Sequence, residues 1–279
     1  MTKKITLKNL SKEPGCLSEY DPNAMNIDLA KKMIASFIEP IKKTESVNLK
    51  NSINRVLAID LISPINVPNY DNSAMDGFGF KLSSLKNTNT LNVKNKILAG
   101  NLTSNHIKDG EAIKIMTGGK IPNGVDTVIP IELVSYKNNQ ITFIEAPKIG
   151  ANIRKAGEDI RKKDIVLKKG TLIYPPELGL IASLGFSKIK VFKKLKVGFF
   201  STGDEIVKVG EKIKSGQVYD SNHFTIHSML SRLNVECIDL EVIPDNKKII
   251  KNTLKKLSNQ ADVIITSGGV SVGEADYMK

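Results

Sequence analysis

Cysteine, histidine and tryptophan are scarce in this sequence of 279 residues, which contains 2 Cys, 3 His and no Trp. Cys16 and Cys237 lie far apart, and neither has a Cys or His nearby at a metal-ligand spacing. The sequence therefore predicts neither a disulfide framework nor a zinc site. A His-based catalytic triad is also disfavoured, so we expect the chemistry to rest on carboxylates, hydroxyls and backbone amides.

Long apolar runs are missing as well, although 41% of the residues are hydrophobic. No stretch approaches the roughly 18 to 20 apolar residues that a membrane-spanning helix needs. The first ten residues also lack the apolar segment of a secretory signal. These absences predict a soluble, cytoplasmic protein without membrane contact.

The net charge of +12 comes from lysines that are spread over the whole chain rather than gathered in one stripe. Aromatic residues make up only 5%, and they do not alternate with basic residues as they do in surfaces that stack bases. Nucleic acid is therefore not an expected partner. A small phosphorylated or oxyanion substrate fits the positive charge better.

The length exceeds one ordinary core, and the character of the sequence changes along the chain. A polar arm is expected first, then an elongated linker and helical domain in two pieces, which enclose a β-rich domain, and last an α/β domain. Their predicted limits are residues 1–25 for the arm, 26–68 with 146–193 for the linker domain, 69–145 for the β-rich domain and 194–279 for the α/β domain.

Capping and turn residues mark several elements of the first three parts. Asn26 is predicted to cap one helix, and Pro175 to begin another that stops at Gly185. The β-branched run 56–62 predicts a strand, and the pair Asn138-Asn139 predicts a hairpin.

The last part alternates short apolar strands with helices, a pattern typical of a doubly wound parallel sheet. Such a sheet needs helices on both faces, and the chain ends just after the third strand, so this domain is expected to be incomplete. The predicted strands are residues 197–200, 235–242 and 263–266, and the predicted helices are residues 224–233 and 246–257.

Polar and glycine-rich segments follow all three of these strands, at residues 201–205, 244–245 and 267–276. The carboxyl ends of parallel strands meet at one edge, where ligands bind in open α/β sheets. Together the segments supply a glycine-rich cradle beside carboxylates, as expected for a phosphate held through Mg²⁺. Each segment alone is more commonly a turn or a helix cap. Neither a Walker A loop nor G-x-G-x-x-G is present.

Three further segments are rich in polar residues: 69–78, 116–119 and 157–159. From chemistry alone, the first is either a solvated turn or a site that presents the Asp76 carboxylate. Thr117 is either a turn hydroxyl or an oxyanion contact. Asp159, in a basic stretch, belongs either to a surface ion-pair cluster or to a cleft.

Residues 68–78 are similar to the P-x-[FY]-[DN]-x-S-A-[MV]-D-G-[FY] signature of the molybdopterin molybdenumtransferases, the family of MoeA and the gephyrin E domain. Other segments resemble further family motifs in family order, and the resemblance extends from about residue 14 to the C-terminus. These segments are residues 115–118, 154–159, 201–205, 219–222 and 267–277.

The resemblance implies the final step of molybdenum cofactor biosynthesis, in which molybdate is inserted into adenylylated molybdopterin with Mg²⁺-dependent release of AMP. It implies a multidomain α/β and mostly-β fold that ends in a truncated molybdopterin-binding domain. It also implies a homodimer, with Asp76 and Thr117 reaching the cleft from the partner subunit, and contact with the molybdopterin adenylyltransferase.

The residues implied for the site fall into three overlapping groups. The catalytic group is Asp76, Thr117, Asp159, Glu205, Asp245 and Asp276. The Mg²⁺ ligands are Glu205, Asp245 and Asp276. The substrate-binding group is Ser201, Thr202, Gly203, Asp204, Ser267, Gly268, Gly269, Ser271 and Gly273.

Family members continue beyond residue 277 with another helix, two proline- and glycine-containing loops and a small β domain. The chain is therefore expected to be a fragment of a family member. An alternative is that this fragment has no activity by itself. Alternatives are a non-catalytic molybdopterin-binding or scaffolding homologue, and a competence-damage type nucleotide hydrolase, which is not expected to carry the motif at residues 73–77. The sequence does not separate molybdenum from tungsten.

Overall fold

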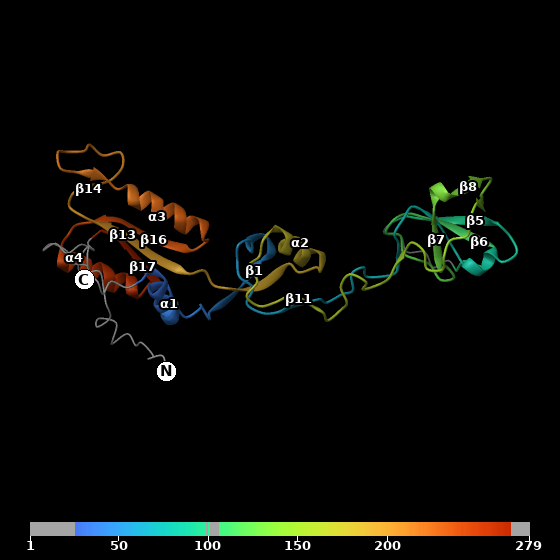
Figure 1. Cartoon of the computed structure of the whole chain (residues 1–279), viewed down its shortest axis with the longest axis horizontal. Coiled ribbons are helices and arrows are strands. Elements are labelled where there is room, and N and C mark those ends of the chain that lie inside the picture. Colours follow the sequence, from blue (N-terminus) through green and yellow to red (C-terminus); the bar gives the residue numbers. More distant parts are fainter. Residues whose placement is uncertain (1–25, 99, 101–105, 269–279) are drawn as a thin grey trace. The chain divides into compact units, whose positions relative to one another are not determined.

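A computed structural model describes residues 26–98, 100 and 106–268 of the chain (Figure 1). They divide into two units. Of the described residues, the parallel-sheet unit combines 26–46 with 190–268, and the mixed-sheet unit is Val47–Ile189. The chain runs between the units through β1 (Thr44–Asn48) and β12 (Lys188–Phe192), which form a two-stranded sheet.

The mixed-sheet unit is built on six strands in the order β7-β4-β6-β5-β9-β8. Its core contains Phe78 and Phe80, both fully buried, with Phe143 packed edge-on against Phe80. Short 3-10 turns, Leu82–Leu85 and Ile131–Leu133, lie beside the sheet. The strands are β4 (Gly77–Phe80), β5 (Thr90–Ile97), β6 (Glu111–Ile115), β7 (Thr127–Pro130), β8 (Val134–Lys137) and β9 (Gln140–Phe143).

The other elements of this unit are two short strand pairs and one helix. Strands β3 (Asn72–Ser73) and β10 (Ile153–Arg154) pair with each other, as do β2 (Leu61–Ile62) and β11 (Ile165–Leu167). The helix is α2 (Pro175–Ser183), and a further 3-10 turn near the start of the unit covers Leu49–Asn51.

Two predictions for this unit are confirmed and one is wrong. The hairpin turns through Asn138 and Asn139, both with positive φ, and α2 begins at Pro175. The run 56–62 is not one strand, because Val56 bridges Leu172 while only its last two residues form β2.

The parallel-sheet unit is a three-stranded sheet in the order β16-β13-β17. Strand β13 (Lys196–Thr202) pairs in parallel with both β16 (Glu236–Ile243) and β17 (Val263–Ser267). Figure 1 shows α3 (Ser221–Arg232) and α4 (Lys247–Ser258) beside these strands. A side arm holds the short pair β14 (Ile206–Val207) and β15 (Val218–Tyr219). The predicted parallel β-α-β-α-β arrangement is therefore confirmed.

Side-chain caps set the helix starts in this unit. Asn26 caps α1 (Ile27–Phe37), as the sequence predicted, by accepting the backbone N–H of Asp28. Asn246, which was predicted as the first residue of α4, is instead its cap and accepts backbone N–H groups of the first turn. The predicted start of α3 at residue 224 is wrong. The helix begins at Ser221, because the Asp220 carboxylate accepts the backbone N–H of His223.

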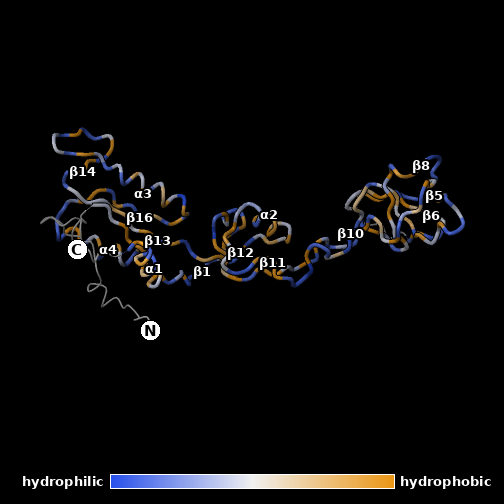
Figure 2. Tube along the Cα trace, in the orientation of Figure 1, coloured by the Kyte–Doolittle hydropathy of each residue, from blue (hydrophilic) through white to orange (hydrophobic). Residues whose placement is uncertain are grey.

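Within the described ranges, no helix combines the length and the apolar character needed to cross a bilayer. Figure 2 shows hydrophobic and hydrophilic residues interspersed along the chain.

Candidate functional site

Three polar motifs that are far apart in the sequence lie side by side in the mixed-sheet unit. Asn72 pairs with Arg154 on one side and bridges Lys120 on the other. Ser73 exchanges backbone hydrogen bonds with the 118–119 turn, at 2.8 and 2.9 Å. Strand β3 therefore brings together the segments 69–78, 116–119 and 154–159.

Asp76 and Thr117 are in direct contact within this cluster. The backbone N–H of Thr117 lies 2.6 Å from Asp76 Oδ1, and its hydroxyl lies 2.8 Å from the same oxygen. The backbone hydrogen bond, followed by the hydroxyl hydrogen bond, lowers the pKa of Asp76 below its ordinary value. The carboxylate is thus held ionised at a fixed position on the surface.

Ion pairs organise the third motif. Arg154 Nε lies 2.6 Å from Glu158 and its Nη2 lies 2.6 Å from Asp159. Lys155 Nζ lies 2.9 Å from Asp71, and its hydrogen bond is the main cause that lowers the pKa of Asp71. The ion-pair cluster that the sequence offered as one interpretation is therefore present, and Asp159 is part of it.

The strand ends of the parallel-sheet unit meet as predicted. Ser201 of β13 stands in register with Val242 of β16 and with Ser267 of β17. The Thr202 hydroxyl donates to Asp245 Oδ1, and the Asp245 backbone N–H lies 3.2 Å from Asp204 Oδ1. Residues of the first and second polar segments are thereby joined at one edge of the sheet.

Gly268, the last described residue of the third segment, packs tightly on this edge. Its φ is +93°, and a Cβ at this position would lie 2.2 Å from the Thr202 carbonyl oxygen. Only glycine allows the chain to pass so close to β13 in this conformation. The remaining predicted residues, Gly269, Ser271, Gly273 and Asp276, lie outside the described residues.

The predicted Mg²⁺ ligands that are described do not form a complete site. The Glu205 carboxylate folds back over Gly203, with its oxygens 2.8 and 2.9 Å from where a Gly203 Cβ would stand. Asp204 and Asp245 add further oxygens, the ligand type that Mg²⁺ prefers. Over the described part of the chain, no three His, Cys, Asp or Glu side chains gather closely enough to hold a metal ion.

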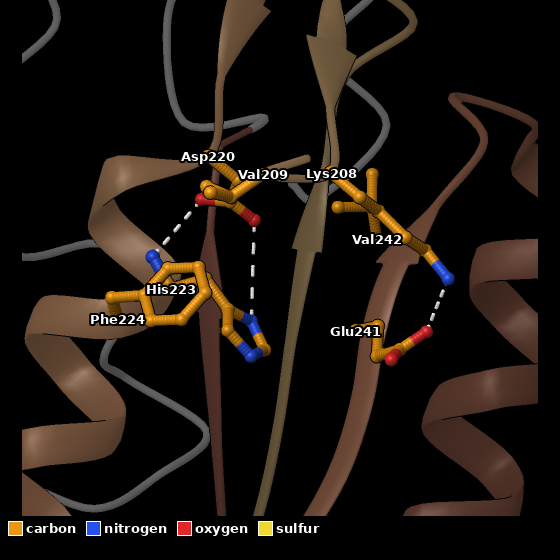
Figure 3. A pocket seen from close by; sticks show the side chains of 7 residues that line it. All are labelled: Lys208, Val209, Asp220, His223, Phe224, Glu241 and Val242. Atoms are coloured by element: carbon orange, nitrogen blue, oxygen red, sulfur yellow. Dashed lines mark hydrogen bonds and ion pairs between the residues drawn. The ribbon is translucent and has the colours of Figure 1, made fainter. Parts of the chain in front are cut away.

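Two cavities open beside these strand ends. One, of about 320 Å³, is lined by residues that include Gly203, Asp204, Lys208 and Pro244. The second, of about 170 Å³, adjoins the start of α3 and is shown in Figure 3. Lys208 lines both.

The residues that line the second cavity are not among the site residues predicted from the sequence. Its lining includes Asp220, His223 and Glu241. The only available signal was the motif at residues 219–222, which contains Asp220.

Comparisons with known proteins bear on both units. Residues 25–185 match the family described as the MoeA N-terminal region (domain I and II), and residues 198–279 match the probable molybdopterin binding domain. The chain belongs to the MoeA family. The fold and family expected from the motifs are thereby confirmed.

Individual relatives agree with this assignment. The molybdopterin molybdenumtransferase of Haemophilus influenzae is 46% identical over 256 residues, which are 91% of this chain and 63% of that protein. The one from Nostoc is 32% identical over 84% of this chain and 55% of its own length. The crystal structure of the molybdopterin biosynthesis moeA protein from Pyrococcus horikoshii matches with a TM-score of 0.80 and 32% identity, covering 85% of this chain and 64% of that one. The chain thus spans less than two thirds of each relative.

Proposed function

We propose that this protein acts in molybdenum cofactor biosynthesis as a molybdopterin molybdenumtransferase. Its substrates are adenylylated molybdopterin and molybdate, and AMP is released. The observation that carries the proposal is the joining of Thr202, Asp204 and Asp245 at the carboxyl edge of the parallel sheet, within the stretch that matches the molybdopterin binding domain. The names of the relatives support the same reaction.

The strand-end residues have distinct roles in this proposal. Glu205, Asp245 and Asp276 would hold Mg²⁺, and Thr202 orients Asp245 through its hydroxyl. When bound there, Mg²⁺ would offset negative charge on the phosphate oxygens of the substrate. We assign binding of the substrate to residues 201–204 and to the 267–273 segment.

The mixed-sheet unit supplies a second set of polar groups. We assign Asp76, Thr117 and Asp159 to the same reaction, with Asp76 and Thr117 entering the cleft of the partner subunit in a homodimer. The fixed position of the Asp76 carboxylate supports this role, because it needs no reordering before it meets a substrate. We also propose that the protein is cytoplasmic and that it contacts the adenylyltransferase that makes its substrate.

The test is AMP release from adenylylated molybdopterin by the protein expressed from its complete gene, with molybdate and Mg²⁺ present. We expect turnover that requires both additions and is lost in Glu205→Ala. A matched control is Glu236→Ala, because Glu236 is an exposed acid at the amino end of β16 whose ion pair with Lys196 lies away from the strand ends.

Two other outcomes are decisive. Tight binding of the substrate without AMP release would show that the protein is a non-catalytic molybdopterin-binding homologue rather than an enzyme. Equal turnover in the Glu205→Ala variant would contradict the assignment of this acid.

A further inference from the structure

The cavity at the start of α3 contains buried polar atoms that have no hydrogen-bond partner. Asp220 is only 5% exposed, and it lines the cavity together with His223 (Figure 3). Its Oδ1 accepts the His223 backbone N–H at 2.9 Å, but its Oδ2 receives no hydrogen bond from the described residues. A buried carboxylate oxygen without a donor is destabilising, so its presence calls for an explanation.

The His223 ring faces the same oxygen and leaves it unsatisfied. His223 Nε2 lies 3.0 Å from Asp239 Oδ2, so this nitrogen carries the proton that is donated to Asp239. The other ring nitrogen, Nδ1, lies 4.0 Å from Asp220 Oδ2, beyond hydrogen-bond distance. Nδ1 also has no hydrogen-bond partner in the described structure. Two buried polar atoms without partners therefore lie close together, and a ligand that donates N–H groups would satisfy the Asp220 oxygen and an unprotonated Nδ1.

The other walls suit a flat ring. Val209 and Val242 are apolar, and Phe224 lines the cavity with 57% of its surface exposed. A planar heterocycle in the cavity would cover this exposed phenyl face. On the far side, Lys208 and Glu241 form an ion pair.

From this arrangement we propose that the cavity binds the pterin ring of the substrate, with the 2-amino-4-oxopyrimidine edge toward Asp220. This edge presents adjacent N–H groups, from the ring nitrogen and from the exocyclic amine, to the carboxylate and to His223 Nδ1. The inference rests on the proposed function for the identity of the pterin. It adds the subsite and the orientation of the ring, with Lys208 lying between this cavity and the one beside Asp204.

The test compares two ligands of nearly the same shape. Pterin (2-amino-4-oxopteridine) carries the amine, whereas lumazine has a carbonyl oxygen in its place. Ligand fluorescence reports binding, and the protein has no Trp whose emission would overlap. We expect pterin to bind at least tenfold more tightly than lumazine, because a site built to accept N–H donors rejects an analogue that lacks one. Equal affinities would overturn the proposal.

Asp220→Asn is the matching variant. Asparagine is a good helix cap, so it keeps the hydrogen bond to the His223 N–H while its amide nitrogen replaces the acceptor Oδ2. We expect the preference for pterin over lumazine to fall to about threefold or less, with an unchanged melting temperature. Asp262→Asn is the control, because Asp262 accepts the Lys196 N–H beyond the amino end of β17, and this variant should keep the full preference.

Two further measurements distinguish an error in the proposed pterin subsite from an error in the proposed function. Guanosine carries the same edge, and if it binds as tightly as pterin and equally depends on Asp220, the site recognises a nucleobase and the pterin assignment is overturned. If the protein binds and processes adenylylated molybdopterin but Asp220→Asn retains the pterin preference, the subsite is wrong while the proposed function stands.

Discussion

Lys208 of the side arm forms an ion pair with Glu241 of β16, and Glu241 makes this contact from a left-handed backbone conformation with φ of +58°. The register between β13 and β16 shifts between Phe199 and Ser201, at the place where Glu241 is inserted. This is a β-bulge, and it directs the Glu241 side chain toward the cavity in Figure 3.

The strain at Glu241 predicts an unusual order of stabilities. Glu241→Ala and Glu241→Gly both lose the ion pair with Lys208, but only glycine adopts a positive φ without cost. We therefore expect the Gly variant to be the more stable of the two. Its free energy of unfolding, measured by urea denaturation, should be about 1 kcal/mol higher than that of the Ala variant. An Ala variant as stable as the Gly variant would show that the left-handed conformation is not strained.

The hydrogen bonds to Asp76 predict a change in its titration. Thr117→Val keeps the backbone N–H but removes the hydroxyl donor, so the pKa of Asp76 should rise toward its ordinary value. Carboxyl chemical shifts followed by NMR across pH 2 to 6, roughly centred on the ordinary Asp value of about 3.9, measure this directly. Thr88→Val is the control, because among the described residues the Thr88 hydroxyl forms hydrogen bonds only with Thr90.

This titration also sets the sign of a pH effect on stability. Because the pKa of Asp76 is lowered in the folded state, its contribution is fully present above the unfolded pKa of about 3.9 and is lost as the pH falls through the lower folded value. The Thr117→Val variant should therefore lose less stability than the wild type on acidification. An identical pH dependence would contradict the coupling.

Gly77 follows Asp76 in the signature motif, and packing accounts for this glycine. A Cβ on Gly77 would lie 1.9 Å from the carbonyl oxygen of Ile129 on the neighbouring strand β7. We expect Gly77→Ala to lower the free energy of unfolding by about 1–3 kcal/mol, because the two strands have to separate. Gly179→Ala is the matched control. It lies in α2 with nothing within 4 Å of its Cβ position, so alanine should raise stability by about 0.5–1 kcal/mol.

Local patterns were enough to predict much of the parallel-sheet unit. Apolar runs separated by capping residues indicated β13, β16 and β17, and the parallel order then placed residues 201, 244 and 267 at one edge. The start of α3 was placed too late, because its first turn is polar and only the Asp220 cap marks it. The broken run 56–62 shows the same limit, since its partners Leu172 and β11 lie more than a hundred residues away.

Other features depended on pairings that no local pattern reveals. The contacts of Asn72 with Lys120 and with Arg154 come from strand pairing over long sequence separations. Nothing about Glu241 indicates a positive φ, because that conformation is typical of Gly and Asn. The unpaired oxygen of Asp220 likewise depends on how α3 packs on β16, where Asp239 contacts the Nε2 atom of His223.

Asp245 offers a way to separate charge from hydrogen bonding at the strand ends. Its Oδ1 accepts the Thr202 hydroxyl, and Asp245→Asn retains a carbonyl oxygen for that bond while removing the negative charge. If Asp245 holds Mg²⁺, the variant should fold normally, yet need at least tenfold more Mg²⁺ for half-maximal AMP release. Thr202→Val is the matched variant, because it breaks the hydrogen bond and leaves the carboxylate in place, and a smaller rise in the Mg²⁺ requirement is expected. If both variants keep the Mg²⁺ dependence of the wild type, Asp245 is a structural link between β13 and β16, and the metal belongs elsewhere.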